Sequence, residues 1–372
     1  MLISLFAATT CTLDLYTDYL ISSTGQTSAT GLSRRLDGEV SPDQVTRWLR
    51  TSYLDSEQVW AHAKPLIRRA EQQRPAAEFA VLIVDDSILE KAHTDPSALM
   101  CTHWDHRQGR FVKGLNFVSL RYQAGDLALP IAVELIEKTE AVWDAKAQKT
   151  KAKSKYTKNE YLRAMLRMAL PGHPQQQVAC RYLLAYRYLL ADRWYASAEN
   201  LNTVLDLGHH FVVALESART VALSEAARAQ DQFQALDALA FPDEQPLRVW
   251  LRSVQPAVLV TRQVLTNKDG SQGVLYLVSY DTNLNQAQLT TIYQRRWKGE
   301  EYHQSLKQNA SMGKSPTKTP DTQANHFFAA ILAYTKLEVL KLKCGAGHFR
   351  LKAQLFLAGL KAMHQELAFF TA

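Results

Sequence analysis

Two short apolar runs, each followed by an aspartate, constrain the fold of this chain more than any other feature. Residues 79–84 (FAVLIV) are rich in β-branched side chains and lead into Asp85, and residues 186–191 (YRYLLA) lead into Asp192. An unbroken apolar run of this length is typical of a strand buried on both faces of a sheet. Because ligands bind where the carboxyl ends of such strands meet, we expect both carboxylates in one crevice, where they can hold a metal ion.

Further strand and helix signals follow the first run in a definite order. The sequence QAGD at 123–126 favours an antiparallel hairpin between two strands. The expected elements are strands at 110–122 and 127–136, a helix at 160–170, the strand at 186–191, a helix from Ser197 and a strand at 210–215. Three strands, a helix, a strand, a helix and a strand is the element order of a ribonuclease H-like fold. We therefore predict an α/β protein whose mixed sheet is flanked by helices.

Shifts in periodicity divide the chain into five predicted segments. A second strand-rich stretch surrounds the turn sequence NKDG at 267–270, and the pattern becomes helical from about residue 285. The segments are a helical part at 1–75, the first part of an α/β core at 76–217, a β-rich insertion at 218–285, the second, helical part of the core at 286–345, and a C-terminal helical segment at 346–372.

Residues 27–50 carry the pattern of a helix-turn-helix. A short helix ends at Asp37-Gly38, and Ser41 then supplies an N-cap, followed by a proline at N1 and a glutamine at N3. Beside a buried Val45 and Trp48, the second helix would present side chains suited to base edges and phosphates. These are Gln44, Thr46, Arg47 and Arg50. An ordinary helical hairpin accounts for the pattern about equally well, because helix-turn-helix patterns have low specificity.

Four polar side chains share one face of the helix predicted at 285–308. They are Tyr293, Arg296, Glu300 and Lys307. Offsets of 3, 7 and 14 residues from the tyrosine, at about 100° per residue, place them within an arc of roughly 60°. A solvated helix face is the ordinary explanation of such a stripe. Here a carboxylate lies among a tyrosine and two cations, which suits a metal-bound phosphate, while Trp297 and Leu306 are left for packing. Glu301 points about 100° away from Glu300 and is expected to play no part.

Short motifs along residues 80–310 add to this stripe. They are DDS at 85–87, EKAHT at 90–94, WDH at 104–106, VKGLN at 112–116, ADRWY at 191–195 and the spaced set Tyr293-x2-Arg296-x3-Glu300-x6-Lys307. Together they resemble the DDE transposases of bacterial insertion sequences, in the group with the Y-R-E-K signature. The last motif, with its full spacing, is the specific part of the resemblance.

The resemblance implies a ribonuclease H-like catalytic core at 76–217 and 286–345, with the β-rich insertion at 218–285 between the second aspartate and the glutamate. It also implies that the helical part at 1–75 is the DNA-binding domain. It implies metal ligands at Asp85, Asp192 and Glu300, which would bind two divalent ions. It also implies DNA contacts near the cut phosphate from Tyr293, Arg296 and Lys307. Asp86 competes with Asp85 for the first position, and Asp85 fits the family pattern of an acid, one variable residue and then Ser or Thr.

The family further implies a DNA hairpin intermediate and an aromatic side chain in the insertion that stacks on an extruded base. Trp250 is a candidate for that role, although a lone tryptophan before a strand is more often part of the core. Two metal ions about 3.5 to 4 Å apart can activate an attacking oxygen and stabilise a leaving oxygen. Three carboxylates favour Mg²⁺ over zinc, and Mn²⁺ should substitute.

Charge favours a nucleic-acid partner. Lys and Arg number 43 against 36 Asp and Glu, and the net charge of +7 favours polyanions. A lysine-rich loop, together with Lys91 and Lys113 near the first acid, would contact phosphates without reading sequence. The lysines of that loop are Lys146, Lys149, Lys151, Lys153, Lys155 and Lys158.

Cysteine and histidine spacing excludes other classes of site. The cysteines form no C-x-x-C pair, so neither a zinc knuckle nor a disulfide framework is encoded. They are Cys11, Cys101, Cys180 and Cys344. His103 and His106 have no partnering cysteines, which disfavours zinc there. No run of about 18 apolar residues occurs, so no membrane span is expected.

We therefore predict a transposase that binds double-stranded DNA at terminal inverted repeats, cuts it and joins it to target DNA by cut-and-paste. Its expected location is the bacterial cytoplasm at the nucleoid. A homodimer is expected because two DNA ends must be paired. Two alternatives stay open: a domesticated DNA-binding protein without catalysis, and a ribonuclease H-like nuclease without strand transfer.

Overall fold

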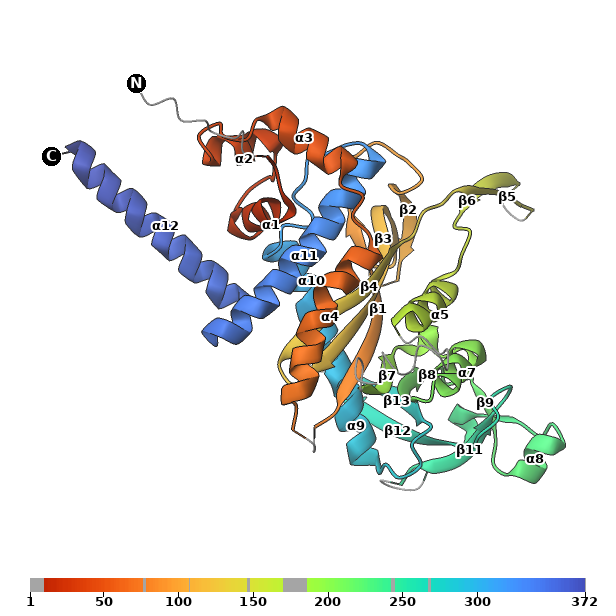
Figure 1. Ribbon diagram of the computed structural model, residues 1–372. Coiled ribbons are helices and arrows are strands. Elements are labelled where there is room, and N and C mark those ends of the chain that lie inside the picture. Colours follow the sequence, from red (N-terminus) through yellow and green to blue (C-terminus); the bar gives the residue numbers. More distant parts are fainter. Residues whose placement is uncertain are drawn as a thin grey trace, which may run out of the picture.

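A large mixed sheet with helices on both faces makes up the centre of the protein (Figure 1). The computed structural model describes residues 10–75, 78–106, 108–145, 148–169, 186–241, 245–266 and 269–371.

The α-helices are α1 (Leu13–Ser22), α2 (Ala29–Arg35), α3 (Pro42–Thr51), α4 (Ser56–Gln73), α5 (Lys158–Ala169), α7 (Ala198–Asp206), α8 (Glu225–Ala229), α9 (Gln286–Gln294), α10 (Lys298–Gln308), α11 (Pro320–Cys344) and α12 (His348–Thr371). Short 3₁₀ helices are η1 (Arg193–Tyr195), η2 (Leu236–Ala238) and η3 (Arg295–Trp297).

The strands of the large sheet run in the order β10-β9-β11-β12-β13-β8-β7-β1-β3-β2, and β4 also pairs with β3. Their bounds are β1 (Ala80–Glu90), β2 (Cys101–Asp105), β3 (Arg110–Ala124), β4 (Leu127–Leu135), β7 (Tyr186–Ala191), β8 (His210–Leu215), β9 (Thr220–Ala222), β10 (Gln234–Ala235), β11 (Leu247–Leu251), β12 (Val258–Thr266) and β13 (Gln272–Ser279). β1, β7 and β8 are parallel neighbours, and β3 pairs antiparallel with β1. The predicted α/β fold with a mixed sheet flanked by helices is confirmed.

The side chains of β1 alternate between two cores. Leu82 and Val84 belong to the core on the side of α4, α5 and α7, whereas Val81 and Ile83 pack with residues of α9 on the other side. A third core joins α10 and α11 to the N-terminal helices. β1 is therefore buried on both faces, as its unbroken apolar run predicts.

β1 is longer than the apolar run predicted. β3 pairs with it from Val81 to Glu90, whereas the parallel pairing with β7 ends at Ile83. Asp85 therefore lies inside a strand and not after one, because the antiparallel ladder continues past the apolar residues. It still comes just beyond the end of the parallel ladder. β7 and β8 have the predicted bounds, and β3 and β4 form the predicted hairpin through a turn at Gly125 and Asp126.

The helix-turn-helix candidate forms two helices, α2 and α3, of which α3 packs against both α2 and α11. Ser41 and Gln44 make the predicted capping box, in which the Ser41 N–H donates to Gln44 Oε1 at 2.7 Å. The side-chain oxygen of Gln44 is therefore used in the cap, and a contact of Gln44 with bases stays a prediction. Asn325 of α11 accepts from the Leu54 N–H and donates to the Leu49 carbonyl, both at 2.7 Å. The N-terminal helices are thus held on the C-terminal part of the chain.

Two regions differ from the predicted loop and insertion. The lysine-rich loop is in part a two-stranded hairpin of β5 (Glu140–Asp144) and β6 (Lys149–Lys153), whose described lysines are exposed. The strands predicted as an insertion extend the same large sheet, because β13 pairs with β8. Lys146, Leu170, Cys180, Asn267 and Lys268 lie outside the described residues.

The helix predicted at 285–308 is broken. α9 ends at Gln294, η3 follows, and α10 begins at Lys298. A 3₁₀ turn advances about 120° per residue in place of about 100°, so the predicted straight stripe does not continue across the break. Trp297, predicted to pack, is 58% exposed, whereas Leu306 is buried as predicted. None of the described helices combines the length and hydropathy of a membrane span.

Candidate active site

Asp85 and Asp192 come together on one face of the sheet. In the parallel pairing of β1 with β7, Ile83 lies opposite Leu190. Asp85 comes two residues after Ile83, and Asp192 comes two residues after Leu190. Since strand side chains alternate, both carboxylates lie on the face covered by α9. Burial raises the pKa of Asp192, and the negative charges of Asp85 and Asp86 raise it further. The two carboxylates are therefore close enough to repel each other.

The Asp85 carboxylate lies among positive and polar groups. Its Oδ2 is 3.6 Å from His303 Nε2 and 4.0 Å from a terminal nitrogen of Arg296. Burial alone would raise the pKa of Asp85, but His303, Arg121 and Arg296 together hold it below its ordinary value. Burial lowers the pKa of His303, and the neighbouring Asp85 partly offsets that shift. Asp85 is thus kept ionised.

Asp86 points to the opposite face of the sheet. Its carboxylate forms an ion pair with Lys158 of α5 and accepts a hydrogen bond from the Tyr195 hydroxyl at 2.8 Å. Lys158, expected to contact phosphates, is therefore used inside the protein. Asp86 has two fixed protein partners, whereas Asp85 shares its face with Asp192. This difference favours Asp85 as the first acid.

The four residues of the predicted stripe have different surroundings. Tyr293 is buried, and the Arg296 guanidinium lies 5.6 Å from its ring centroid. Glu300 and Lys307 are exposed. The positive charge of Lys307 acts on His303. The stripe is thus split into a buried part beside the aspartates and an exposed part on α10.

Glu300 does not complete a three-carboxylate cluster. Among the described residues, no group of three His, Cys, Asp or Glu side chains is arranged to hold a metal ion. Gly299 and His303 occupy the side of α10 that faces Asp85, and Glu300 lies about 60° around the helix from His303. The three acids do not converge in this conformation, because the helix break and His303 leave Glu300 on the flank of α10, and a role for Glu300 at the metal site stays a prediction. The two aspartates themselves fit a divalent cation, since it would relieve their repulsion.

Comparisons with known proteins identify the family of this chain. The family described as "DDE superfamily endonuclease" matches residues 3–235, and the one described as "Transposase DDE domain" matches residues 148–336. Each match covers more than half of the chain. The chain belongs to the DDE transposase family. No curated protein matches this DDE chain in sequence.

Two solved structures are similar to parts of the DDE chain. A crystal structure of a pre-cleavage Mos1 transpososome shares 14% identity over 50% of this chain and 54% of that chain, with a TM-score of 0.18. The mariner Mos1 paired end complex with Mg shares 13% identity over 48% of this chain and 52% of that chain, with a TM-score of 0.16. This chain therefore matches about half the length of each Mos1 chain. Similarity at these TM-scores supports no conclusion about activity.

A buried arginine beside Asp85 was missed from the sequence. Arg121 of β3 is 1% exposed, and its guanidinium lies 4.6 Å from the Tyr302 ring centroid. It donates to the Lys298 carbonyl at 3.4 Å, and its positive charge acts on Asp85. Nothing in the strand pattern distinguishes this arginine, because only the packing of α10 on β1 and β3 brings it to the acid.

Gly299 allows α10 to approach Asp85 and Arg121. A Cβ atom added at Gly299 would lie 2.5 Å from Arg121 Nη2 and 3.2 Å from Asp85 Oδ2. We expect Gly299→Ala to lower the free energy of unfolding by about 1–3 kcal/mol through overpacking, measured by denaturant titration. Gly359→Ala is the matched control, since nothing lies within 4 Å of its added Cβ. The control should be neutral or stabilising. Equal stability of the two variants would contradict the close approach.

Exposed aromatic side chains gather next to Asp192 and were also missed. Trp194 is 57% exposed, and its backbone N–H donates to the Asp192 carboxylate at 3.0 Å. The His106 ring lies 5.9 Å from the Trp194 ring, between centroids, and Trp104 contacts both His106 and Phe111. The WDH and DRWY motifs contain three of these residues, yet only the fold joins β2 and β3 to η1. A surface of this kind is typical of binding sites.

Other predicted DNA contacts have structural partners. Lys91 Nζ donates to the Ser315 carbonyl at 2.9 Å, so it is used inside the protein. Trp250 is half-buried in β11 opposite Ala222 of β9, with the Arg248 guanidinium 5.9 Å from its ring centroid. Base stacking by Trp250 stays a prediction.

Proposed function

We propose that this DDE chain is a transposase of bacterial insertion sequences, in the group with the Y-R-E-K signature. It would cut DNA at terminal inverted repeats and join the ends to target DNA. The observation that carries the proposal is the meeting of Asp85 and Asp192 beyond the ends of two parallel strands. The order β4-β3-β1-β7-β8, with β1, β7 and β8 parallel, supports a ribonuclease H-like core.

In this proposal Asp85, Asp192 and Glu300 would hold two Mg²⁺ ions, with Mn²⁺ as a substitute. When bound, such ions activate an attacking oxygen and stabilise the leaving oxygen of a phosphodiester. The chain keeps Asp85 ionised through Arg121 and Arg296. Because Glu300 is exposed on the first turn of α10, its side chain can turn toward the aspartates without leaving a buried contact.

DNA would lie across the aromatic surface beside Asp192 and the exposed side of α10. Arg296 and Lys307 would contact phosphates near the cut, and the buried Tyr293 would support the Arg296 guanidinium from below. The exposed lysines of the β5–β6 hairpin would contact phosphates farther along the duplex. A homodimer would hold two ends for cut-and-paste transposition through hairpin intermediates, at the bacterial nucleoid.

Incubation with labelled inverted-repeat DNA and a target plasmid tests the function as a whole. We expect Mg²⁺-dependent cutting at the repeat end followed by covalent joining to the plasmid, measured on denaturing and agarose gels. Binding without cutting would favour a domesticated DNA-binding protein. Cutting without joining would favour a nuclease, and either result would overturn the proposed strand transfer.

A further inference from the structure

Two side chains at the start of α12 hold the C-terminal end of α10. His348 Nδ1 lies 2.8 Å from the Ser305 hydroxyl. One turn farther along α12, Lys352 Nζ donates to the Gln308 carbonyl at 2.8 Å and to the Asn309 carbonyl at 3.4 Å. A cation at these carbonyls also complements the negative end of the helix dipole. We call His348 and Lys352 together the α12 anchor.

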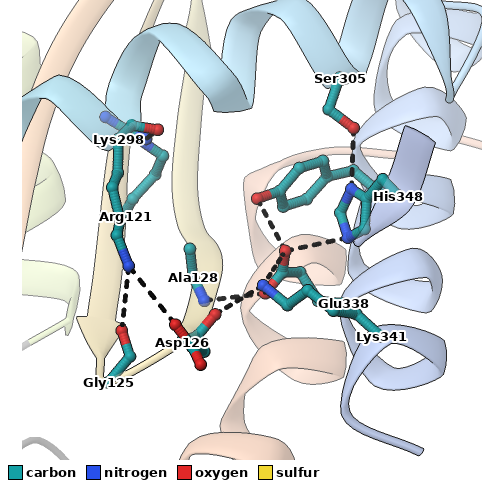
Figure 2. A network of polar contacts seen from close by, with 10 residues as sticks. Arg121, Gly125, Asp126, Ala128, Lys298, Ser305, Glu338, Lys341 and His348 are labelled. Carbon is teal, nitrogen blue, oxygen red and sulfur yellow. Dashed lines mark hydrogen bonds and ion pairs between the residues drawn. The ribbon is translucent and has the colours of Figure 1, made fainter. Parts of the chain in front are cut away.

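Buried groups of α11 and β4 hold the α12 anchor in turn (Figure 2). Glu338 of α11 is 2% exposed and lies 3.0 Å from His348 Nε2. Its carboxylate accepts from the Ala128 N–H at 2.9 Å and pairs with Lys341 at 2.7 Å. Ser305 and His348 are buried as well. Because a buried polar group that loses its partner costs free energy, these contacts fix the direction of each side chain.

The opposite end of α10, which carries Glu300, has longer polar contacts. Arg121 donates to the Lys298 carbonyl at 3.4 Å. Lys298 Nζ lies 3.5 Å from the Gly125 carbonyl and 3.7 Å from Asp126, as Figure 2 shows. Hydrogen bonds of this length are weaker than those near 2.8 Å. The shortest polar contacts that hold α10 are therefore those of the α12 anchor.

We propose that His348 and Lys352 are positioning residues, which fix the rotation of α10 about its axis and thereby the approach of Glu300 to Asp85. This inference rests on the proposed function, because it gives the α12 anchor a part in cleavage. Ser305 and Glu300 lie within about one and a half turns of one helix, which rotates as a unit.

A small rotation is enough to matter. At a radius of about 5–6 Å, a rotation of about 10° moves a side-chain tip by about 1 Å. A displacement of about 1 Å at a reacting centre can cost on the order of 100-fold in rate. Gly299 already lies close to Asp85 and Arg121, so the first turn of α10 has little room on that side.

Two substitutions of His348 separate its two contacts. His348→Asn keeps a polar atom near the position of Nδ1, which faces Ser305, and loses the contact with Glu338. His348→Gln keeps a polar atom near the position of Nε2, which faces Glu338, and loses the contact with Ser305. The Asn309 amide donates to the Ser305 hydroxyl at 3.1 Å, so the hydroxyl hydrogen is free to donate to the imidazole or to an asparagine oxygen. Each variant loses one buried contact, so their stabilities should be similar.

Single-turnover cleavage of end DNA by the full chain tests the positioning role. We expect His348→Gln to lower the cleavage rate about 10-fold or more with an unchanged dissociation constant for DNA, and His348→Asn to stay within about threefold of the wild type. Lys352→Met keeps much of the apolar stem and removes the ammonium group, so it should lower the rate about 10-fold as well. Lys361→Met, at an exposed position of α12, is the matched control.

Hydrogen exchange of the chain without DNA measures the hold on α10 directly. We expect amides of residues 298–308 to exchange about 10-fold faster in His348→Gln and Lys352→Met than in the wild type. His348→Asn and Lys361→Met should leave their exchange unchanged. Amides of β1 and β7 report on the sheet and should keep the wild-type rate in all four variants.

A lower cleavage rate in His348→Gln together with faster exchange of α10, both restored in His348→Asn, would support the positioning role. Wild-type cleavage by His348→Gln, equal loss in both His348 variants, or loss of cleavage without faster exchange would overturn it. Absence of cleavage by the wild type would overturn the proposed function instead. The exchange difference between the two His348 variants would then still show that the α12 anchor holds α10, so the two failures can be told apart.

Discussion

Asp192→Asn should reduce strand cleavage by on the order of 1,000-fold or more while leaving binding of end DNA nearly unchanged. Asparagine has the shape of aspartate but lacks the charge that a divalent cation requires. The Trp194 N–H that donates to Asp192 can still donate to the asparagine oxygen, so η1 should keep its position. Single-turnover cleavage in Mg²⁺ and a gel-shift titration of the same DNA measure the two effects.

The same variant should be at least as stable as the wild type in metal-free buffer. The pKa of Asp192 is raised in the folded chain, so ionising the folded protein costs free energy. This destabilisation is present above the folded-state pKa and is lost as pH falls below it. Unfolding measurements from pH 4 to pH 8 should therefore show a wild-type decline at higher pH that is smaller in Asp192→Asn.

An exposed aspartate far along the chain provides the control. Asp237 lies in η2, and Asp237→Asn should change neither cleavage nor the pH dependence of stability. Cleavage by Asp192→Asn at the wild-type rate would exclude Asp192 as a metal ligand. Loss of DNA binding together with cleavage would instead indicate a structural role.

Glu300→Gln should lose nearly all cleavage, whereas Glu301→Gln should stay within about threefold of the wild type. The two glutamates are adjacent and both are exposed on the first turn of α10. Helix geometry places Glu300 about 60° from His303, which faces Asp85, and places Glu301 about 160° from it. Glu300 therefore lies nearer than Glu301 to the side of α10 that faces Asp85.

The paired design separates catalysis from stability. Surface substitutions of this kind usually change the free energy of unfolding by less than about 0.5 kcal/mol, so both variants should unfold alike in urea. Equal loss of cleavage in Glu300→Gln and Glu301→Gln would indicate that cleavage depends on the negative charge of the first turn of α10 and not on the position of Glu300. Full activity of Glu300→Gln would remove Glu300 from the proposed site.

Much of the fold was predictable because its signals are local. The capping box of Ser41 and Gln44 formed as predicted, and β7 and β8 have the predicted bounds. Errors arose where a distant partner changed a local element. Antiparallel pairing with β3 carried β1 past Asp85, and the helix predicted at 285–308 broke at η3.

The candidate site was predictable only in part. Asp85 and Asp192 could be grouped because each directly follows an apolar run, although the pairing of β1 with β7 that brings them together appears only in the structure. The positions of Arg121, Gly299 and His303 could not, since their closeness to Asp85 depends on how α10 packs on the sheet. Helical periodicity placed Tyr293 and Lys307 on one helix face, but in the structure Tyr293 is buried and Lys307 is exposed.

The order of residues by itself determined the bounds of β7 and β8, the cap at Ser41 and the apolar runs that lead into Asp85 and Asp192, because each depends on neighbours within a few positions. Only the tertiary structure decided that Asp86 pairs with Lys158, that Glu300 sits on the flank of α10 and that Arg121 lies beside Asp85. Those outcomes depend on contacts between residues far apart in the chain, where burial and charge outweigh local preference.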